Sequence, residues 1–172
     1  FLEILMNPKN NNKLAITVLL AAKNEELNIS KCLESLRPAE KIYVLDSHSS
    51  DRTAEISKSF GAEVVQFNYS GGYPKKRQWA MESLDIQTSW ILLIDADEVV
   101  PDLLWSEISE CINKKEAADA YMINKGFHFL GKKMKFGGFS FDAVLLLKAG
   151  KGIFEELVDD DVSGFDMEVH ER

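Results

Sequence analysis

The sequence is poor in cysteine and has no long hydrophobic run. Cys32 and Cys111 stand far apart, so neither a disulfide framework nor a thiolate metal site is supported, and we expect two buried thiols. No apolar run reaches the roughly 18 to 20 residues that cross a bilayer. Residues 1–10 carry no basic flank and no small-residue cleavage site, so we expect a cytoplasmic protein.

Clustered positive charge and the common phosphate-binding loops are also missing. The formal net charge is −8, and most of it lies in 151–172, where eight acidic residues stand against two basic ones. Nucleic acid binds to clustered Lys and Arg, so it is not expected as a partner. The chain has no GxxxxGK followed by Ser or Thr and no GxGxxG, which excludes a P-loop and a dinucleotide fold.

The composition and periodicity that are present predict one α/β domain covering 1–172. With 172 residues, of which 45% are hydrophobic and 28% charged, the chain can bury a single core. Short apolar runs predict strands, and amphipathic spacing predicts helices between them. The strands are expected at 14–22, 42–45, 63–67 and 90–94, and the helices at 27–36, 53–60, 74–84 and 102–113. This alternation predicts βαβ crossovers and a mostly parallel sheet.

The pattern changes in the second part of the chain. Strands expected at 120–129 and 142–148 bracket the Gly- and Lys-rich segment 131–138. We therefore divide the domain into an α/β half over 1–113 and a more antiparallel half over 114–172. Ligands of open α/β sheets bind outside the carboxyl ends of the strands. Polar clusters follow three strands at that edge, at 23–26, 46–51 and 95–98.

The cluster with the clearest chemistry contains Asp95 and Asp97. In an extended chain, residues two apart point to the same side, so both carboxylates can face one point. Hard oxygen ligands suit Mg²⁺ or Mn²⁺, which takes its remaining ligands from water and phosphates. The alternative is a solvated loop that caps the helix near Pro101. We favour the metal because the pair ends a buried strand beside other polar clusters.

Two further positions predict contacts with a nucleotide. Asp46 ends a buried strand and can accept hydrogen bonds from a ribose or a base edge, although helix capping is the alternative. Arg77 follows the Gly71 and Gly72 loop at the start of a helix, where a diphosphate would fit, but solvated helical cations are common. Within 46–51 we expect His48 on the surface, and the last two residues of that cluster as helix caps.

The polar clusters and their flanks resemble glycosyltransferase family 2. The resemblance rests on LLAAKNEE at 19–26, CLESL at 32–36, VLDSHSSDRT at 44–53 and ILLIDADE at 91–98, and it resumes at 129–132, 137–139 and 169–171. The chain is most similar in these motifs to small bacterial members that resemble lipopolysaccharide-core β-1,4-glucosyltransferases. Each motif alone is weak, but their order and spacing are specific.

This resemblance implies a GT-A fold, with a mostly parallel sheet covered by helices on both faces. It implies an inverting hexosyltransferase that uses a nucleoside-diphosphate sugar, with UDP-glucose as the first guess, and Mn²⁺ or Mg²⁺. The implied acceptor is a saccharide or a lipid-linked molecule in cell-surface polysaccharide synthesis. The residues that would contact the nucleotide or its diphosphate are Ala22, Asn24, Glu25, Asp46, Arg77 and Asp95; those that would hold the metal are Asp95, Asp97 and His170.

Inversion requires one carboxylate to take the proton of the acceptor hydroxyl. The resemblance offers Asp142, in the place of the family's aromatic-Pro-Asp segment, and Glu171. Phe141 stands where the family has Pro, and Val144 and Leu146 stand where it has Gln and Arg. Family members also continue past the His-Glu pair, so we expect the acceptor-side half to be truncated here.

Two other functions are consistent with these residues. The departures from the family pattern favour a degenerate domain that binds a donor without transfer. A sugar nucleotidyltransferase shares the layout, but it carries a Gly-rich, Arg-containing loop where this chain has 23–26. The aromatic and basic segment 127–136 predicts either peripheral contact with the inner face of the membrane or an amphipathic hairpin. The acidic residues 159–161 are expected to form a solvated turn.

Overall fold

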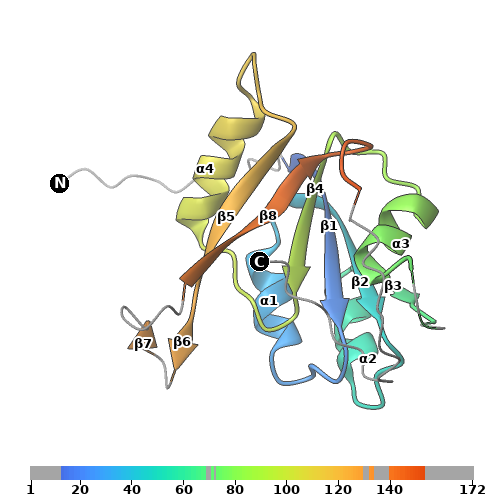
Figure 1. Ribbon diagram of the computed structural model, residues 1–172. Helices are drawn as coiled ribbons and strands as arrows, with labels where there is room; N and C mark the ends of the chain where they lie inside the picture. Colours follow the sequence, from blue (N-terminus) through green and yellow to red (C-terminus); the bar gives the residue numbers. More distant parts are fainter. Residues whose placement is uncertain (1–12, 69–70, 72, 130–131, 134–139, 154–172) are drawn as a thin grey trace.

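The computed structural model describes residues 13–68, 71, 73–129, 132–133 and 140–153 (Figure 1). Twelve elements follow one another in these residues, and six strands form one sheet in the order β3-β2-β1-β4-β8-β5. The strands of this sheet are β1 (Leu14–Ala22), β2 (Ala39–Asp46), β3 (Glu63–Gln66), β4 (Trp90–Asp95), β5 (Ala120–Gly126) and β8 (Ser140–Lys148). Two short strands, β6 (His128–Phe129) and β7 (Lys132–Lys133), form a separate ribbon.

The first four strands along the chain are parallel, as the sequence predicts. β1 lies in the middle and pairs in parallel with β2 on one side and β4 on the other. Its residues 16–22 are all buried. A strand that is buried on both faces reads as a continuous apolar run, which is the pattern that led to its prediction.

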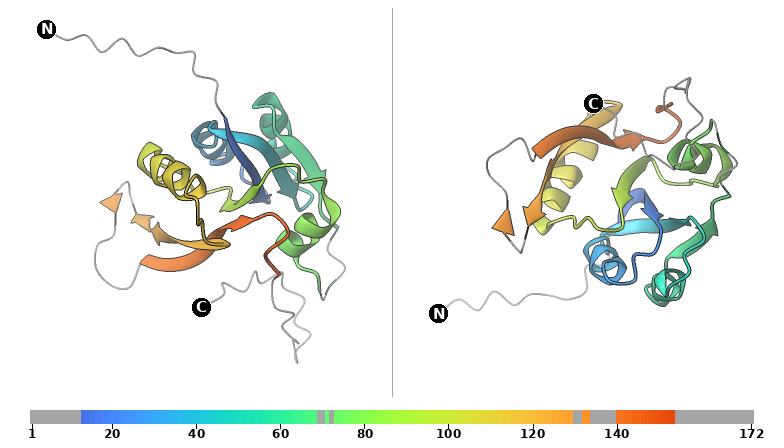
Figure 2. Two further views of the ribbon diagram at one scale, coloured as in Figure 1. Left: turned by 90° about the horizontal axis from the view of Figure 1, so that it is seen from above. Right: turned by 60° about the horizontal axis from the view of Figure 1, so that its bottom comes forward.

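Helices cover both faces of this parallel part (Figure 2). The helices α1 (Ile29–Ser35), α2 (Thr53–Ser59) and α4 (Asp102–Ile112) lie on one face, and α3 (Lys76–Ser83) lies on the other. The indole nitrogen of Trp105 in α4 donates to the carbonyl of Ser35 in α1 at 2.7 Å. Gly61 follows α2 with a φ of 81°, the left-handed conformation predicted for a residue after a helix.

The last two strands of the sheet are antiparallel to their neighbours. β8 pairs antiparallel with β4 and also with β5. The ladder shifts between Tyr121 and Met122, because β8 carries one extra residue there. This bulge lets Leu145, Leu146 and Leu147 all be buried in succession. The more antiparallel character predicted for the later strands of the sheet is confirmed.

Two details differ from the sequence prediction. β2 begins at Ala39 and not at Ile42, because Leu14 pairs with Ala39 and the polar residues that follow lie at a partly exposed strand start. Cys32 is buried as expected, and burial together with nearby carboxylates raises its pKa to about 12. Cys111 is only partly buried, because α4 buries Trp105 and Ile108 instead. Among the described helices, none combines the length and the apolar character needed to cross a membrane.

Candidate functional site

The register of the parallel strands brings three polar strand ends together at one edge. Ala22, the last residue of β1, lies beside Asp46 of β2, and the preceding Ala21 lies beside Asp95 of β4. The two aspartates therefore flank the end of the central strand. The polar clusters that we expected to share the carboxyl edge of the sheet do share it.

The loops after β1 and β2 are joined by hydrogen bonds. Asn24 accepts the amide of Ser50 with its side-chain oxygen at 2.8 Å. The amide of Glu25 donates to the hydroxyl of Thr53 at 2.8 Å, and the amide of Glu26 donates to Asp51 at 3.0 Å. Asn24 adopts a φ of 56°, a conformation that Asn tolerates better than most residues. The loop that carries Glu25 is thus held in place without a ligand.

Asp51 and Asp46 hold this edge from the side of β2. Asp51 also accepts the amide of Thr53, the first residue of α2, at 2.9 Å, although the cap position itself is taken by Arg52 and not by the predicted residues. Asp46 is 1% exposed, and its carboxylate accepts the amide of Ser49 at 3.2 Å and the side-chain amide of Gln66 at 2.8 Å. Asp46 is therefore fixed in one orientation at the strand end.

The local geometry expected at Asp95 is wrong in one respect. β4 ends at Asp95, and Ala96 and Asp97 form a turn closed by the amide of Glu98, which donates to the carbonyl of Asp95 at 3.0 Å. Asp95 and Asp97 are therefore not alternate residues of an extended strand. The turn forms because Glu98 also accepts the amide of Asp95 with its carboxylate at 3.0 Å.

The carboxylate of Asp95 is contacted by two cations. Arg77 of α3 donates to it at 2.6 Å, and the ammonium of Lys125 in β5 lies 3.5 Å from its second oxygen. The same ammonium lies 2.6 Å from Glu98. The Nε of Arg77 is buried and has no hydrogen-bond partner among the described residues. Arg77 thus reaches the edge as predicted, but there it pairs with Asp95.

Lys125 is the residue of this site that sequence reasoning missed. It is separated from the Asp95 motif by α4, and nothing in its neighbourhood in the sequence distinguishes it from the other lysines of the chain. The alternation of side-chain directions along β5 is the signal that could have indicated its position. Tyr121 on the same strand donates its hydroxyl to the carbonyl of Cys111 in α4 at 3.2 Å, so Lys125, four residues on, belongs to the same face.

The pKa of Asp97, in the turn after β4, is raised. The cause is first the loss of solvent around the carboxyl group and then the negative charge of Asp95. The carboxylates of Asp95 and Asp97 form a set of hard oxygen ligands that a divalent cation would stabilise. No group of three or more His, Cys, Asp or Glu suited to a metal occurs among the described residues. Asp95 and Asp97 are described carboxylates that could hold a metal here.

Asp142 lies on the second half of the sheet. It pairs across the ladder with Asn124, whose side-chain amide donates to it at 2.8 Å, and it is exposed. Because residues alternate along β5, Asn124 and Asp142 face away from the side that carries Lys125. Glu171 and His170, the other candidates for the base and the metal shell, lie outside the described residues, as do residues 159–161 and, within 127–136, residues 130–131 and 134–136.

Comparison with known proteins identifies the family. The model of glycosyl transferase family 2 matches residues 17–141. The chain belongs to this family. The match includes the loops at the carboxyl edge and reaches into β8, so it covers both halves of the sheet. The α/β fold expected for a family 2 member, with helices on both faces of a mostly parallel sheet, is confirmed by the strand order.

Curated relatives of this family 2 chain are bacterial. The lipopolysaccharide core biosynthesis glycosyltransferase LpsC of Rhizobium meliloti (strain 1021) is 31% identical over 127 residues, which are 67% of this chain and 46% of LpsC. An uncharacterized glycosyltransferase of Rickettsia bellii (strain RML369-C) is 35% identical over 108 residues, 62% of this chain and 35% of the relative. The chain spans less than half the length of both relatives.

Solved structures also align with the family 2 domain. Mannosyl-3-phosphoglycerate synthase from Rubrobacter xylanophilus aligns with a TM-score of 0.49 and 23% identity, covering 59% of this chain and 37% of that one. Glucosyl-3-phosphoglycerate synthase from Mycobacterium tuberculosis, in a complex with Mn²⁺ and uridine diphosphate, aligns with a TM-score of 0.47 and 24% identity over 58% and 40% of the two chains.

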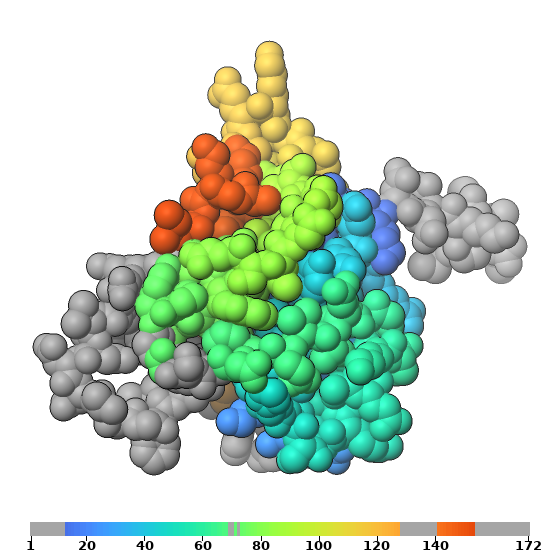
Figure 3. Space-filling view, turned by 90° about the vertical axis from the view of Figure 1, so that its right-hand side faces the viewer, coloured from blue at the N-terminus to red at the C-terminus, as the bar shows by residue number. Residues whose placement is uncertain are grey.

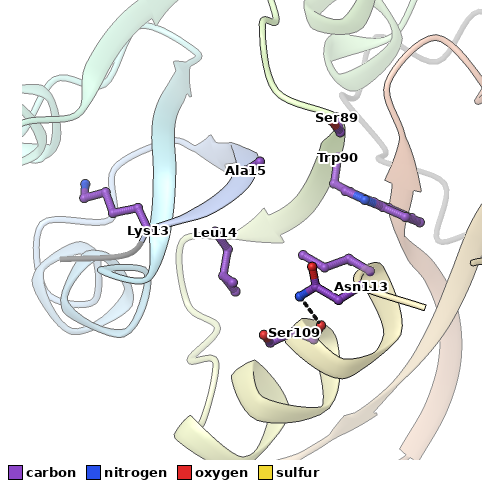
Figure 4. A pocket seen from close by; sticks show the side chains of 8 residues that line it. Lys13, Leu14, Ala15, Ser89, Trp90, Ser109 and Asn113 are labelled. Atoms are coloured by element: carbon purple, nitrogen blue, oxygen red, sulfur yellow. Dashed lines mark hydrogen bonds between the residues drawn. The ribbon is translucent and has the colours of Figure 1, made fainter. Parts of the chain in front are cut away.

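A pocket at the opposite end of the sheet is not part of this family 2 site. The starts of β1 and β4 and the end of α4 line it (Figure 4). Its lining is made by Lys13, Leu14, Ala15, Ser89, Trp90, Ser109, Ile112 and Asn113. Next to it, the amide of Ala149 donates to the carbonyl of Ser89 at 3.0 Å, and Figure 3 shows the end of β8 in orange against the yellow-green segment before β4. Ligands of α/β sheets bind at the other edge.

Proposed function

We propose that the chain is the donor-binding part of an inverting, metal-dependent glycosyltransferase. It would move a hexose from a nucleoside-diphosphate sugar, with UDP-glucose as the first candidate, to a saccharide or lipid-linked acceptor in cell-surface polysaccharide synthesis. The observation that carries this proposal is the carboxyl edge, where Asp46 and Asp95 flank the end of the central strand and Asp97 follows in the turn after β4, in a chain of family 2.

The nucleoside would lie against the two joined loops. Glu25 and Asn24 present their side chains from the loop after β1, and Asp46 presents its carboxylate from the end of β2. Because these loops are held by hydrogen bonds to Thr53 and Ser50, little order would be lost when a nucleotide binds. The carbonyl of Ala22 accepts the amide of Ser47 at 3.1 Å, so Ala22 would contribute close backbone approach rather than a free acceptor.

The carboxylates of Asp97 and Asp95 would hold Mn²⁺ or Mg²⁺, with His170 as a further candidate ligand. When bound, such an ion neutralises the charge that develops on a nucleoside-diphosphate leaving group. Two protein carboxylates leave room for phosphate oxygens and water in the coordination shell. Arg77 lies 2.6 Å from Asp95 and would reach the same diphosphate with its guanidinium.

The base is assigned to Asp142 in this proposal. As the acceptor oxygen forms a bond to the anomeric carbon from one side, the bond to the diphosphate breaks on the other side, which inverts the carbon. The carboxylate of Asp142 takes the proton of the acceptor hydroxyl, and the bond donated by Asn124 keeps that carboxylate oriented. Glu171 is the alternative base.

Titration calorimetry with UDP tests the metal-dependent donor site. We expect UDP to bind in the presence of Mn²⁺ and to lose about 100-fold in affinity with chelator or in Asp97→Asn, because one of two protein ligands is removed. The matched control is Asp119→Asn, a carboxylate that pairs with Lys148 away from the carboxyl edge. Equal UDP affinity with and without chelator would contradict the metal site.

A domain that binds the donor without transfer is the second candidate. Leu146 stands in the place of the family's Arg and is 1% exposed in the sheet, so no cation from this position can reach a diphosphate. Release of the sugar to water from UDP-glucose distinguishes the two functions, since a domain that only binds releases none. The hydrogen-bonded acidic loop after β1 gives no support to a sugar nucleotidyltransferase, which needs a Gly-rich cationic loop there.

Contact of 127–136 with a membrane stays a prediction.

A further inference from the structure

Lys125 connects the two halves of the sheet at the proposed metal site. Its side chain is 16% exposed, and its ammonium lies 2.6 Å from Glu98 and 3.5 Å from Asp95. It also lies 5.6 Å from the centroid of the Phe141 ring on the neighbouring strand β8. A long cationic side chain that is held by two carboxylates and an aromatic ring has a defined position, in contrast to a solvated lysine.

The charges around the Asp95 turn are partly balanced without a metal. Four carboxylates, those of Glu25, Asp95, Asp97 and Glu98, stand against the two cations Arg77 and Lys125. Lys125 therefore already supplies part of the positive charge that the carboxylates need. A divalent ion that binds to Asp95 has to compete with this ammonium, because both use the same oxygens.

From this geometry we infer that the ammonium of Lys125 is part of the donor site. In the absence of metal it pairs with Asp95 and Glu98, and when metal and donor bind together it turns to the donor's diphosphate. This inference rests on the proposed function. A diphosphate brings the negative charge that a released ammonium needs, so metal and donor are expected to bind cooperatively. Lys125 would then be a donor-binding residue, because its ammonium contacts the diphosphate.

Two binding measurements on Lys125→Met test the inference, and the affinities for Mn²⁺ and for UDP are expected to change in opposite directions. Without nucleotide, Mn²⁺ binding measured by the loss of the free-ion paramagnetic resonance signal should become about five to ten times tighter, because the competing ammonium is gone. At saturating Mn²⁺, UDP binding measured by calorimetry should become about five to ten times weaker, because the diphosphate loses a cation.

The control variants separate this effect from a loss of structure. Lys41→Met removes an ammonium that lies 2.6 Å from Glu63 at the other side of the sheet, and it should change neither affinity. Lys125→Arg keeps the charge and should restore both affinities toward those of the wild type. Should Lys125→Met fail to unfold cooperatively on heating, Lys125→Gln takes its place.

Each result has a defined reading. If Lys125→Met binds Mn²⁺ no more tightly than the wild type and is only less stable, Lys125 is a structural tie between β5 and the Asp95 turn, and the inference is wrong. If both affinities change in the same direction, the inference is also wrong. Failure of the proposed function looks different, because the wild-type chain itself would then bind no UDP at any concentration of Mn²⁺.

Discussion

The parallel strands and the antiparallel strands belong to one sheet, yet they are buried in different ways. β1 has seven consecutive buried residues, from Ile16 to Ala22, because helices cover both of its faces. β5 alternates between exposed and partly buried residues, and Met122 of β5 and its ladder partner Val144 of β8 are 64% and 50% exposed. The described helix over this half is α4, on one face.

The two halves also differ in how their polar side chains are held. The loops of the parallel half are joined by hydrogen bonds between Asn24, Glu25 and Glu26 on one side and Ser50, Thr53 and Asp51 on the other. In the antiparallel half, Asp142 is held by Asn124 on an exposed face. We infer that the side proposed for the donor is preformed, and that the side proposed for the acceptor is open to a second molecule.

The largest expected effect concerns the core. Leu20→Ala in β1 removes a fully buried side chain between two layers of helices and should lower the free energy of unfolding by about 3 kcal/mol. Val144→Ala in β8 should change it by less than about 0.5 kcal/mol, because the side chain is half exposed. Urea unfolding measures both. Similar losses would mean that the open face of β8 is covered in solution.

The next effect separates binding from turnover. Asp142→Asn should lower the rate of sugar release from UDP-glucose by about 100-fold or more, because a general base is lost. It should leave the affinity for UDP unchanged, because Asp142 is held by Asn124 on the face of the sheet away from Lys125. Donor hydrolysis and calorimetry on the same preparation measure the two quantities. A loss of UDP affinity as large as the loss of rate would show that Asp142 also contributes to donor binding.

A smaller effect concerns the joined loops. Thr53 is buried, and its hydroxyl accepts the amide of Glu25 and donates to Asp51. Thr53→Val should cost about 1 to 2 kcal/mol of unfolding free energy, because it leaves both partners without that bond. The control is Ser106→Ala in α4, whose hydroxyl donates to the carbonyl of Asp102 on an exposed surface. Thermal unfolding compares them, and an equal effect of the two variants would argue against a preformed donor side.

The smallest effects depend on pH and have opposite signs in the two halves. The hydrogen bond and the charge of Lys148 hold the pKa of Asp119 below its ordinary value, so this pair stabilises the fold above the ordinary carboxyl pKa of about 4 and loses that effect as the pH falls through the lowered pKa. Desolvation and Asp95 raise the pKa of Asp97, so its ionisation destabilises the metal-free fold as the pH rises above about 4.

Thermal unfolding without metal, followed from about pH 3 to 7, distinguishes these two carboxylates. Asp97→Asn should be at least as stable as the wild type at neutral pH, and Asp119→Asn should be less stable there. Both differences should shrink toward the acid end of the range. If Asp97→Asn were clearly less stable than the wild type at neutral pH, its carboxylate would have a structural partner and would be a poor metal ligand.

Much of the fold and part of the site followed from the residues. The strands 14–22 and 90–94 were predictable because burial on both faces requires a continuous apolar run, and the polar clusters mark where those runs end. The sequence therefore predicts that Asp46, Asp95 and the loop of Glu25 share one edge of the sheet. The start of β2 was missed, because polar residues at a strand start carry no apolar pattern.

The antiparallel half was less predictable. The alternation of β5 indicates a strand but does not say which strand it pairs with, and the bulge opposite Tyr121 shifts the register in a way that no local pattern reveals. The turn at Ala96 and Asp97 was also missed, because the Glu98 carboxylate that supports it acts on the backbone of Asp95 through space.

The sequence by itself determined which residues end the buried strands and what chemistry their carboxylates offer, because hydrophobic periodicity and residue type are local properties. Only the tertiary structure decided that Arg77 and Lys125 both contact Asp95, from α3 and from β5. Those contacts join segments that are far apart in the chain, and their geometry depends on strand order and register, which are set by packing across the whole sheet.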